Sequence, residues 1–381
     1  MSGYLLGYDI GSSTIKASLL EIETGYQVAS ASSPATELPI LAPQLGWAEQ
    51  DPIMWWQHLV AATNAIRDAI DERKIRKIQA IGVSYQMHGL VLVDSADRVL
   101  RPAIIWCDSR AVELGSRALR DLGSDKTLRL LLNSPGNFTA SKMRWVIENE
   151  PEVAAATSYM LLPGDYIVSK LTGEYATTPS GLSEGILWNY EKSGMADFLI
   201  NHYGIDRNKI PSLVGNFGYQ GTLTKVAASS LGLRTGIPIT YRAGDQPNNA
   251  LSLGVLEPGA VAATAGTSGV VYGVTEKPSC DLQQRVNTFV HVNYTKEKPR
   301  FGVLLCLNGT GILYSWLRSN CVGNGSYDEM NAAAATSPIG AAGLVVLPFG
   351  NGAERMFGNQ NLQASVHGLA FNTHHRGHLF R

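Results

Sequence analysis

The chain has 381 residues, 45% of them hydrophobic and 17% charged, and its 31 Lys and Arg residues nearly balance its 32 Asp and Glu residues. This composition is globular and excludes wholesale disorder, and the length predicts two domains because single cores stop growing at about 250–300 residues. A nucleic-acid-binding domain usually has a basic face and a high pI, so the net charge of −1 argues against that class.

Four cysteines are spread along the chain without the spacing of a disulfide framework or a zinc site, and we expect reduced thiols. They are Cys107, Cys280, Cys306 and Cys321. The amino terminus lacks a basic stretch followed by a long apolar core, and every apolar run is far shorter than the roughly 18–20 residues that cross a bilayer. The sequence therefore predicts a soluble cytoplasmic protein with no membrane partner.

Three strand-like runs open the chain at residues 4–10, 14–22 and 26–32, and short polar turns join them. Consecutive strands with short connections predict an antiparallel meander. The next signal is Asp51 followed by Pro52, which is typical of a helix start. Apolar residues then recur at helical spacing through residue 72, so a helix with one apolar face is expected there.

The remaining elements are less regular and include a stretch of loops and short helices over 172–221. Further strands are expected at 78–84, 90–93, 103–107, 237–242, 261–264, 270–274, 289–294, 301–305 and 344–347. Further helices are expected at 109–132, 141–150 with Ser141 as its cap, 165–171, 247–253 and 311–318. No low-complexity linker divides the chain, so the pattern alone places a domain boundary between residues 1–242 and 243–381.

One short pattern occurs near the start of each proposed domain: a strand, a Gly-Ser/Thr-Ser turn, and a second strand. The turns are Gly11-Ser12-Ser13 and Gly266-Thr267-Ser268. A duplicated domain would produce this repetition, and so would coincidence. Glycine lets a backbone approach a ligand, and hydroxyls with successive N–H groups supply donors, so two such turns could hold a polyphosphate. The alternative is a pair of ordinary hairpin turns.

Asp9 ends the otherwise apolar first strand, which favours a functional first turn. A carboxylate at that position could order the Mg²⁺ that accompanies a nucleotide. Other common nucleotide-binding and catalytic motifs are absent from the sequence: there is no P-loop, no GxGxxG opening a helix, no protein-kinase signature, no GxSxG elbow and no HExxH.

Polar residues also end two later strands, where they would lie at the edge of a sheet. Gln86 and His88 follow one strand and offer donors and acceptors suited to sugar hydroxyls. Trp106, Asp108 and Arg110 follow another, and an aromatic ring with a carboxylate and a guanidinium would suit a sugar. These residues could equally be a buried histidine, a core tryptophan and a local ion pair that caps the next helix.

Asp245 lies between a strand end and a helix start. It is read either as a helix N-cap or as a general base that accepts a proton from an attacking hydroxyl, the carboxylate that phosphoryl transfer needs most. Near the chain end, His374, His375 and His378 resemble a metal cluster but are better read as a solvated tail.

Taken in order, these segments resemble the FGGY family of carbohydrate kinases. The matching segments are Asp9 to Lys16, Trp47 to Pro52 with Trp55-Trp56, Gln86 to Gly89, Trp106 to Arg110, Phe138 to Trp145, Gly244-Asp245, Ala265 to Gly269 and Glu354-Arg355. The Gln-Met-His-Gly segment is similar to that of the xylulose-phosphorylating branch. The resemblance runs collinearly from Tyr4 to the chain end, and the ordered set is far more specific than any single motif.

The resemblance implies an α/β protein with the actin-like ATPase (ribonuclease H-like) fold, in which two related domains bind MgATP and sugar in the cleft between them. It implies transfer of the ATP γ-phosphoryl group to the 5-hydroxyl of D-xylulose, with Asp245 as the base. The implied sugar-binding residues are Gln86, Met87, His88, Trp106, Asp108, Arg110 and Gln246. The implied residues for ATP and Mg²⁺ are Asp9, Gly11, Ser12, Ser13, Thr14, Lys16, Gly266, Thr267 and Ser268, with Asp9 as the metal ligand.

Two departures from the family pattern leave other functions open. Family members commonly have Asn after the catalytic Asp, whereas this chain has Gln246. The family's later adenosine-binding segment has no counterpart in these 381 residues, so the second domain is expected to be incomplete. A kinase for another ketose or gluconate therefore stays open, as does a sugar-binding fragment without turnover. The oligomeric state stays open too, a homodimer included.

Overall fold

The computed structural model describes residues 3–266, 268–323, 325–350, 353–357 and 360–381. They form two compact units. The first unit comprises the chain through Pro258 together with 274–280 and 288–302, and the second comprises 259–273, 281–287 and 303–381. The division after residue 242 that the sequence suggests differs from this packing and stays a prediction of how the family's two domains divide.

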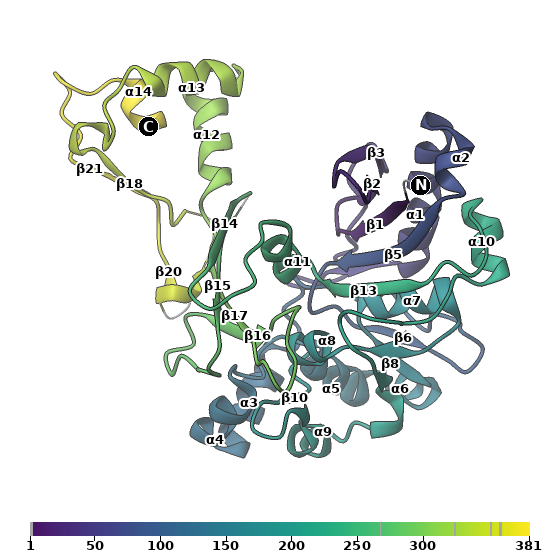
Figure 1. The fold of residues 1–381 in the computed structure, drawn as a ribbon. Helices are drawn as coiled ribbons and strands as arrows, with labels where there is room; N and C mark the ends of the chain where they lie inside the picture. The colour runs from purple at the N-terminus through teal and green to yellow at the C-terminus, as the bar shows by residue number, and fades with distance from the viewer. Residues whose placement is uncertain (1–2, 267, 324, 351–352, 358–359) are drawn as a thin grey trace. The chain divides into compact units, whose positions relative to one another are not determined.

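A five-stranded sheet organises the first unit. Its strands are β1 (Tyr4–Ile10), β2 (Ile15–Glu21), β3 (Gln27–Ser33), β5 (Ile78–Tyr85) and β13 (Ile239–Gly244), in the order β13-β5-β1-β2-β3. The antiparallel pairing of β1 with β2 and of β2 with β3 confirms the predicted meander. Strands β5 and β13 lie side by side, parallel to each other and to β1 (Figure 1).

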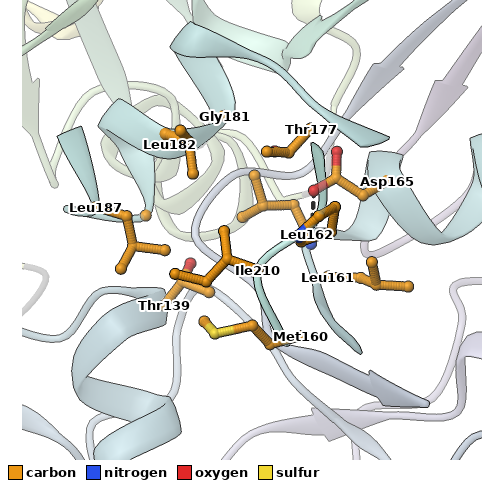
Figure 2. Close-up of a pocket in the computed structure, with 12 residues that line it drawn as sticks. Thr139, Met160, Leu161, Leu162, Asp165, Thr177, Gly181, Leu182, Leu187 and Ile210 are labelled. Carbon is orange, nitrogen blue, oxygen red and sulfur yellow. Dashed lines mark hydrogen bonds between the residues drawn. The ribbon is translucent and has the colours of Figure 1, made fainter. Parts of the chain in front are cut away.

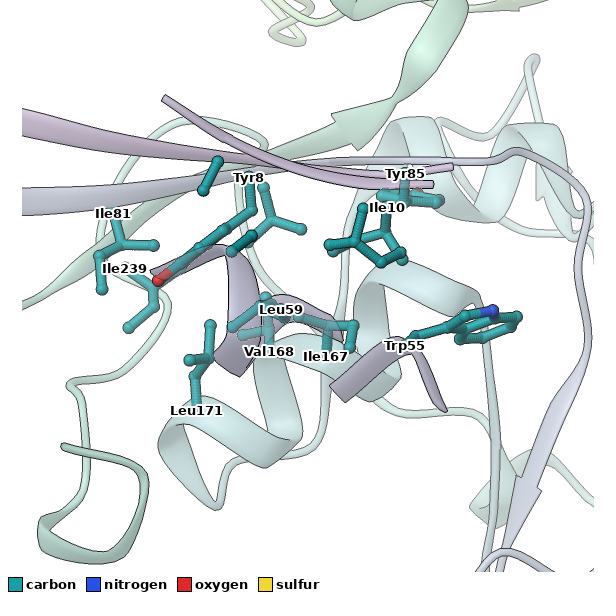
Figure 3. Packing of buried hydrophobic residues seen from close by; sticks show 14 of the residues in the cluster. Tyr8, Ile10, Trp55, Leu59, Ile81, Tyr85, Ile167, Val168, Leu171 and Ile239 are labelled. Carbon is teal, nitrogen blue, oxygen red and sulfur yellow. The ribbon is translucent and has the colours of Figure 1, made fainter. Parts of the chain in front are cut away.

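Two helices cover one face of this sheet. Helix α1 (Pro52–Ala69) begins as predicted, because the Asp51 carboxylate accepts a hydrogen bond from the backbone N–H of Ile53 at 2.9 Å. Helix α7 (Pro163–Thr172) packs beside it. Figure 3 shows Trp55 and Leu59 of α1 and residues of α7 meeting the side chains that point down from the sheet. Alternate residues of β1 are buried, as a strand with one face on a core requires.

The rest of the first unit packs partly on this core and partly around a second hydrophobic cluster. Its elements are β4 (Glu49–Gln50), α2 (Glu72–Ile75), β6 (Val91–Val93), β7 (Ala103–Ile104), α3 (Val112–Leu122), α4 (Ser124–Leu131), α5 (Thr139–Asn149), α6 (Pro151–Ala156), β8 (Tyr159–Leu161), β9 (Ala176–Thr177), α8 (Pro179–Glu184), β10 (Trp188–Asn189), β11 (Gly194–Met195), α9 (Asp197–Tyr203), β12 (Ser212–Leu213), α10 (Lys225–Leu231) and α11 (Asp245–Ser252). Strand β16 (Asn287–Val290) contributes Phe289 and Val290 to the same cluster.

Two helix predictions in this region are wrong in detail. The helix expected over 109–132 is two helices, α3 and α4, because Gly123 between them has a φ of +86°, outside the helical range. Ser141 was expected to cap a helix but lies inside α5, where Phe138 holds the N-cap position. Its hydroxyl instead donates to the carbonyl of Pro135 at 3.1 Å, so a buried contact outside the helix uses this serine.

The second unit begins with a hairpin. Strands β14 (Val261–Ala265) and β15 (Gly269–Thr275) pair antiparallel, as predicted. The later elements are β17 (Phe301–Leu307), α12 (Gly311–Cys321), α13 (Tyr327–Ala335), β18 (Val345–Leu347), β19 (Ala353–Glu354), β20 (Gln360–Asn361), β21 (Ser365–His367) and α14 (Arg376–Phe380).

The histidines near the chain end are not a solvated tail. His375 caps α14, since its Nδ1 accepts from the backbone N–H of Gly377 at 3.1 Å, and His378 is buried. Within the described ranges, no group of three or more His, Cys, Asp and Glu residues could hold a metal ion. No helix among those residues is long and apolar enough to cross a membrane.

Candidate active site

Three loops of the first unit meet because their strands are parallel. Ile10 of β1 is paired with Tyr85 of β5, and Tyr85 is paired with Gly244 of β13. The carboxyl ends of these strands therefore lie in one row, and in open α/β sheets ligands bind at this edge. The Gly11-Ser12-Ser13 turn, the Gln86-Met87-His88 segment and Asp245 all follow directly from it.

The first turn is held by its backbone. The Gly11 N–H donates to the Thr14 carbonyl at 3.2 Å, and the Ser12 carbonyl accepts from the Gln50 side chain at 2.6 Å. The Ser13 carbonyl accepts from the N–H of Leu38 at 2.8 Å. These backbone contacts hold the turn in place, and the Ser12 hydroxyl accepts a hydrogen bond from the indole N–H of Trp106.

Asp9 lies at the end of β1 and is partly exposed. Its carboxylate is 3.5 Å from the Lys16 ammonium, on the neighbouring strand. Both residues line a cavity of about 250 Å³ together with Tyr241 and Asn248. A solvent-accessible carboxylate beside a cation is suited to a phosphate group with its metal ion.

Asp245 is the first residue of α11, and Gly244 holds the N-cap position. The N-cap interpretation of Asp245 is therefore wrong, and the helix begins two residues earlier than predicted. Burial raises the pKa of the Asp245 carboxyl to about 7, and the negative charge of Asp9 adds to the effect. A carboxyl group that titrates near neutral pH is well suited to accept a proton from a hydroxyl.

His88 has an unusual backbone conformation, with a φ of +62°. Its Nδ1 lies 2.9 Å from the backbone carbonyl of Glu184, and because a carbonyl only accepts, Nδ1 carries the proton. In the neutral ring, Nε2 is then the acceptor nitrogen. The ring packs against Phe138 and Phe289, with centroid distances of 4.8 and 5.4 Å. No sequence pattern signals this strained backbone.

Gln86 and Met87 are both buried beside His88. Gln86 donates to the side chain of Gln50 at 3.2 Å. Met87 packs so closely on Gly244 that a Cβ at position 244 would lie 2.5 Å from its Cγ. Gln246 is partly buried next to Asp245. Met87 is therefore packed against the residue that precedes Asp245.

Trp106 is 53% exposed, and its indole N–H donates to the Ser12 hydroxyl at 3.3 Å. The structure therefore brings Trp106 to the first turn. An exposed aromatic ring beside a hydroxyl group offers a flat apolar face for one side of a sugar.

Asp108 and Arg110 are instead enclosed in a cluster of motif residues. The Arg110 guanidinium contacts the carboxylates of Asp108 and Glu49, each at 2.7 Å. It also stacks on Trp47 and Trp145, at 3.7 and 4.8 Å from the ring centroids. The geometry matches the local ion pair that the sequence left open, and sugar contact by Asp108 or Arg110 stays a prediction.

Glu184 is a residue that sequence reasoning missed. Its side chain is 1% exposed, and burial raises its carboxyl pKa well above the usual range, with Asp245 and Asp165 adding to the effect. Arg242 is as deeply buried as Glu184, and its guanidinium lies 3.4 Å from the carboxylate of Asp165. Asp165 also accepts from the Leu162 N–H at the wall of a small pocket (Figure 2). In the sequence, Glu184 is a lone acidic residue in a stretch without periodicity, so no pattern marked it as a candidate site residue.

The second unit carries the other predicted phosphate turn. The Gly266 N–H donates to the Ser268 carbonyl at 3.1 Å, and the Gly266 carbonyl accepts from the Gly311 N–H at 2.9 Å. Thr267 lies outside the described residues. Gly266 and Gly311 line a cavity of about 550 Å³ with Tyr314 and Tyr327, whose rings are stacked at 5.7 Å.

Comparison with known proteins decides the family. The N-terminal domain of the FGGY family of carbohydrate kinases matches residues 4–252. This chain belongs to that family. It is 29% identical to the xylulose kinase of Escherichia coli strain K12 over 373 residues, covering 98% of this chain and 73% of that protein. It is also 29% identical to the Bacillus subtilis xylulose kinase, covering 99% of this chain and 74% of the relative.

Solved structures of FGGY kinases share the fold. The xylulose kinase from Rhodospirillum rubrum superposes with a TM-score of 0.85 at 27% identity, over 99% of this chain and 75% of that one. A gluconate kinase from Lactobacillus acidophilus gives a TM-score of 0.86 at 22% identity, over 100% and 75%. The expected α/β fold of the actin-like ATPases is thus confirmed, and the chain is a carbohydrate kinase, an enzyme class that uses ATP.

Proposed function

We propose that this FGGY kinase is a xylulokinase, which transfers the γ-phosphoryl group of ATP to the 5-hydroxyl of D-xylulose and releases D-xylulose 5-phosphate and ADP. The observation that carries the proposal is the position of Asp245, with a pKa of about 7, at the sheet edge that also bears Met87 and His88. The similarity to xylulose kinases supports the choice of sugar.

Asp245 acts as the general base. Its carboxylate takes the proton of the 5-hydroxyl as that oxygen forms a bond to the γ-phosphorus and the bond between this phosphorus and the ADP oxygen breaks. His88 offers Nε2 as an acceptor for a sugar hydroxyl, because Nδ1 donates to Glu184. The Gln246 amide offers both a donor and an acceptor. Trp106 supplies an apolar face.

The residues of the first turn fit MgATP. Mg²⁺ is commonly bound by one or two carboxylates together with water and phosphate oxygens, and Asp9 is one such partly exposed carboxylate. Mg²⁺ held there would neutralise phosphate charge during transfer. The hydroxyls of Ser12, Ser13 and Thr14, the Gly11 backbone and the Lys16 ammonium would contact phosphate oxygens. Gly266 and Ser268 would do so from the second unit.

Replacing Asp245 by Asn tests the base. A general base contributes about 10²- to 10⁴-fold to the rate, so Asp245→Asn should lower kcat by that factor while sugar affinity stays close to that of the unaltered chain. A coupled ADP-release assay measures the rate, and calorimetry measures D-xylulose binding. Asp197→Asn, which alters a surface ion pair with Arg207, is the control. Retained turnover in Asp245→Asn would remove Asp245 as the base.

Phosphorylation of another ketose, or of gluconate, is the second candidate. Gln246, where relatives of this family commonly have Asn, is the residue that favours it, because a longer amide changes the reach to a sugar hydroxyl. The assay is therefore repeated with L-ribulose, gluconate and glycerol. Turnover of gluconate or glycerol far above that of D-xylulose would replace the sugar assignment. Sugar binding without any MgATP binding would instead identify a sugar-binding protein without turnover.

A further inference from the structure

A single buried cation contacts two loops of the candidate sugar site. Lys142 of α5 is fully buried, at 0% exposure. Its ammonium donates to the backbone carbonyl of His88 at 2.8 Å and to that of Ile105 at 2.9 Å. His88 carries the imidazole of the site, and Ile105 directly precedes Trp106. One side chain therefore connects the ends of β5 and β7.

The ammonium is held by carbonyl groups and not by an acid. Among the ion pairs within the described part of the chain, none involves Lys142, and the nearby Asp108 is engaged by Arg110. Burying an ammonium without a close carboxylate is costly, and burial lowers the Lys142 pKa to about 7. A methionine would fill the same space without that cost, so the contacts to the two carbonyls are what distinguishes lysine here.

The conformation of His88 is the reason that its carbonyl needs a partner. A non-glycine residue with a φ of +62° is strained, and it persists only where the surroundings hold it. Lys142 holds the carbonyl of this residue, and Glu184 accepts from Nδ1 of its ring at 2.9 Å. These contacts fix the main chain and the ring independently. Loss of the hydrogen bond from Lys142 to the His88 carbonyl would let the main chain relax and rotate the imidazole.

We propose that Lys142 is a positioning residue of the sugar site, whose ammonium holds the carbonyls of His88 and Ile105 so that the imidazole and the Trp106 ring keep the geometry that binds sugar. The effect on sugar affinity rests on the proposed function, whereas the restraint on the two loops does not. The Lys142 ammonium is buried and donates to backbone carbonyls of the two sugar-site loops, so its removal should weaken sugar binding much more than MgATP binding.

Lys142→Met tests the proposal, since it keeps the volume and removes the donors. Calorimetry should show the dissociation constant for D-xylulose rising at least about tenfold, the equivalent of one charged hydrogen bond. Hydrogen exchange followed by mass spectrometry should show faster exchange in segments 86–90 and 105–108 only. Lys209→Met is the matched control, because Lys209 also donates to a backbone carbonyl, that of Ala154 at 2.5 Å.

The two measurements separate the proposals. Faster exchange in both segments without any D-xylulose binding by the unaltered chain would support the positioning role and refute the sugar assignment. Unchanged exchange and unchanged sugar affinity in Lys142→Met would overturn the positioning role. If the methionine variant does not fold, Lys142→Gln is measured instead, with a smaller loss expected because its amide is neutral and shorter. Unaltered D-xylulose affinity in Lys142→Gln, or loss of folding in both Lys142 variants, would also overturn the positioning role.

Discussion

At the scale of single residues, the burial of Asp245 and the charge of Asp9 together set the pKa of the proposed base. A base works only when deprotonated, so kcat should fall as the pH drops below about 7, the pKa of Asp245. Removing the Asp9 charge in Asp9→Asn should lower the pKa of Asp245, because a like charge no longer opposes its ionisation. Carbon-13 NMR titration of the ligand-free protein measures this pKa directly. An unchanged value in Asp9→Asn would show that the Asp9 charge does not raise the pKa of Asp245.

The same carboxyl group makes stability depend on pH. An unfolded Asp titrates near 3.9, whereas folded Asp245 titrates near 7, so the folded chain binds the extra proton between these values. The contribution of Asp245 to stability is therefore largest at low pH and is lost as the pH rises towards 7. The Asp245→Asn variant has no ionisable group at this position, so its stability does not fall in this way as the pH rises.

We therefore expect the melting temperature of Asp245→Asn to exceed that of the unaltered chain above pH 7, by an amount that shrinks towards pH 4. Differential scanning calorimetry across this range measures the difference. Asp197→Asn again serves as the control, because the Asp197 side chain is half-buried and paired with Arg207. A difference that grows towards low pH would contradict the raised pKa.

At the scale of elements, the junction of β13 with α11 depends on the absence of a side chain at Gly244. An added Cβ would lie 2.5 Å from both the Glu184 carboxyl group and the Met87 side chain. Gly244→Ala should therefore move Met87 and the start of α11, lower the melting temperature and weaken sugar binding. Gly194→Ala in β11 is the control, since its Cβ would have only an ordinary 3.8 Å contact. Equal melting temperatures for the two variants would show that the junction tolerates a side chain.

Local signals explain which elements could be predicted from the sequence. Strand-like apolar runs joined by short polar turns indicated the first three strands, and Asp51 followed by Pro52 indicated the start of α1. The start of α11 was missed because its N-cap is Gly244, which has no side chain to signal a cap. The break between α3 and α4 could have been read from Gly123, although glycine alone does not reveal its φ.

The site divides in the same way between local and long-range information. The sequence placed Asp9 at the end of a strand and His88 and Asp245 after strands, and parallel pairing then brought the strand ends together. By contrast, Glu184 and Lys142 both contact His88, and each lies tens of residues from it in the sequence. Contacts of that kind depend on the packed tertiary structure and leave no periodic trace in the sequence.

At the scale of the whole molecule, the groups proposed for sugar all belong to the first unit, whereas the cavity lined by Gly266, Gly311 and Tyr314 belongs to the second. If this cavity receives part of the nucleotide, a substitution in one unit should weaken the binding of one ligand and leave the binding of the other unchanged. Tyr314→Ala should weaken MgATP binding, because it removes a stacked ring and its hydrogen bond to Asn331. Its D-xylulose affinity should match that of the unaltered chain.

His88→Ala should give the opposite result, with weaker D-xylulose binding and unaltered MgATP binding. Calorimetry with one ligand at a time measures both, so that coupling between bound ligands does not enter. The pair of variants distinguishes two separate sites from a general loss of structure, which would weaken both ligands together. A change of sugar affinity in Tyr314→Ala without nucleotide present would mean that the second unit contributes directly to sugar binding, and the assignment of the sugar groups to the first unit would be wrong.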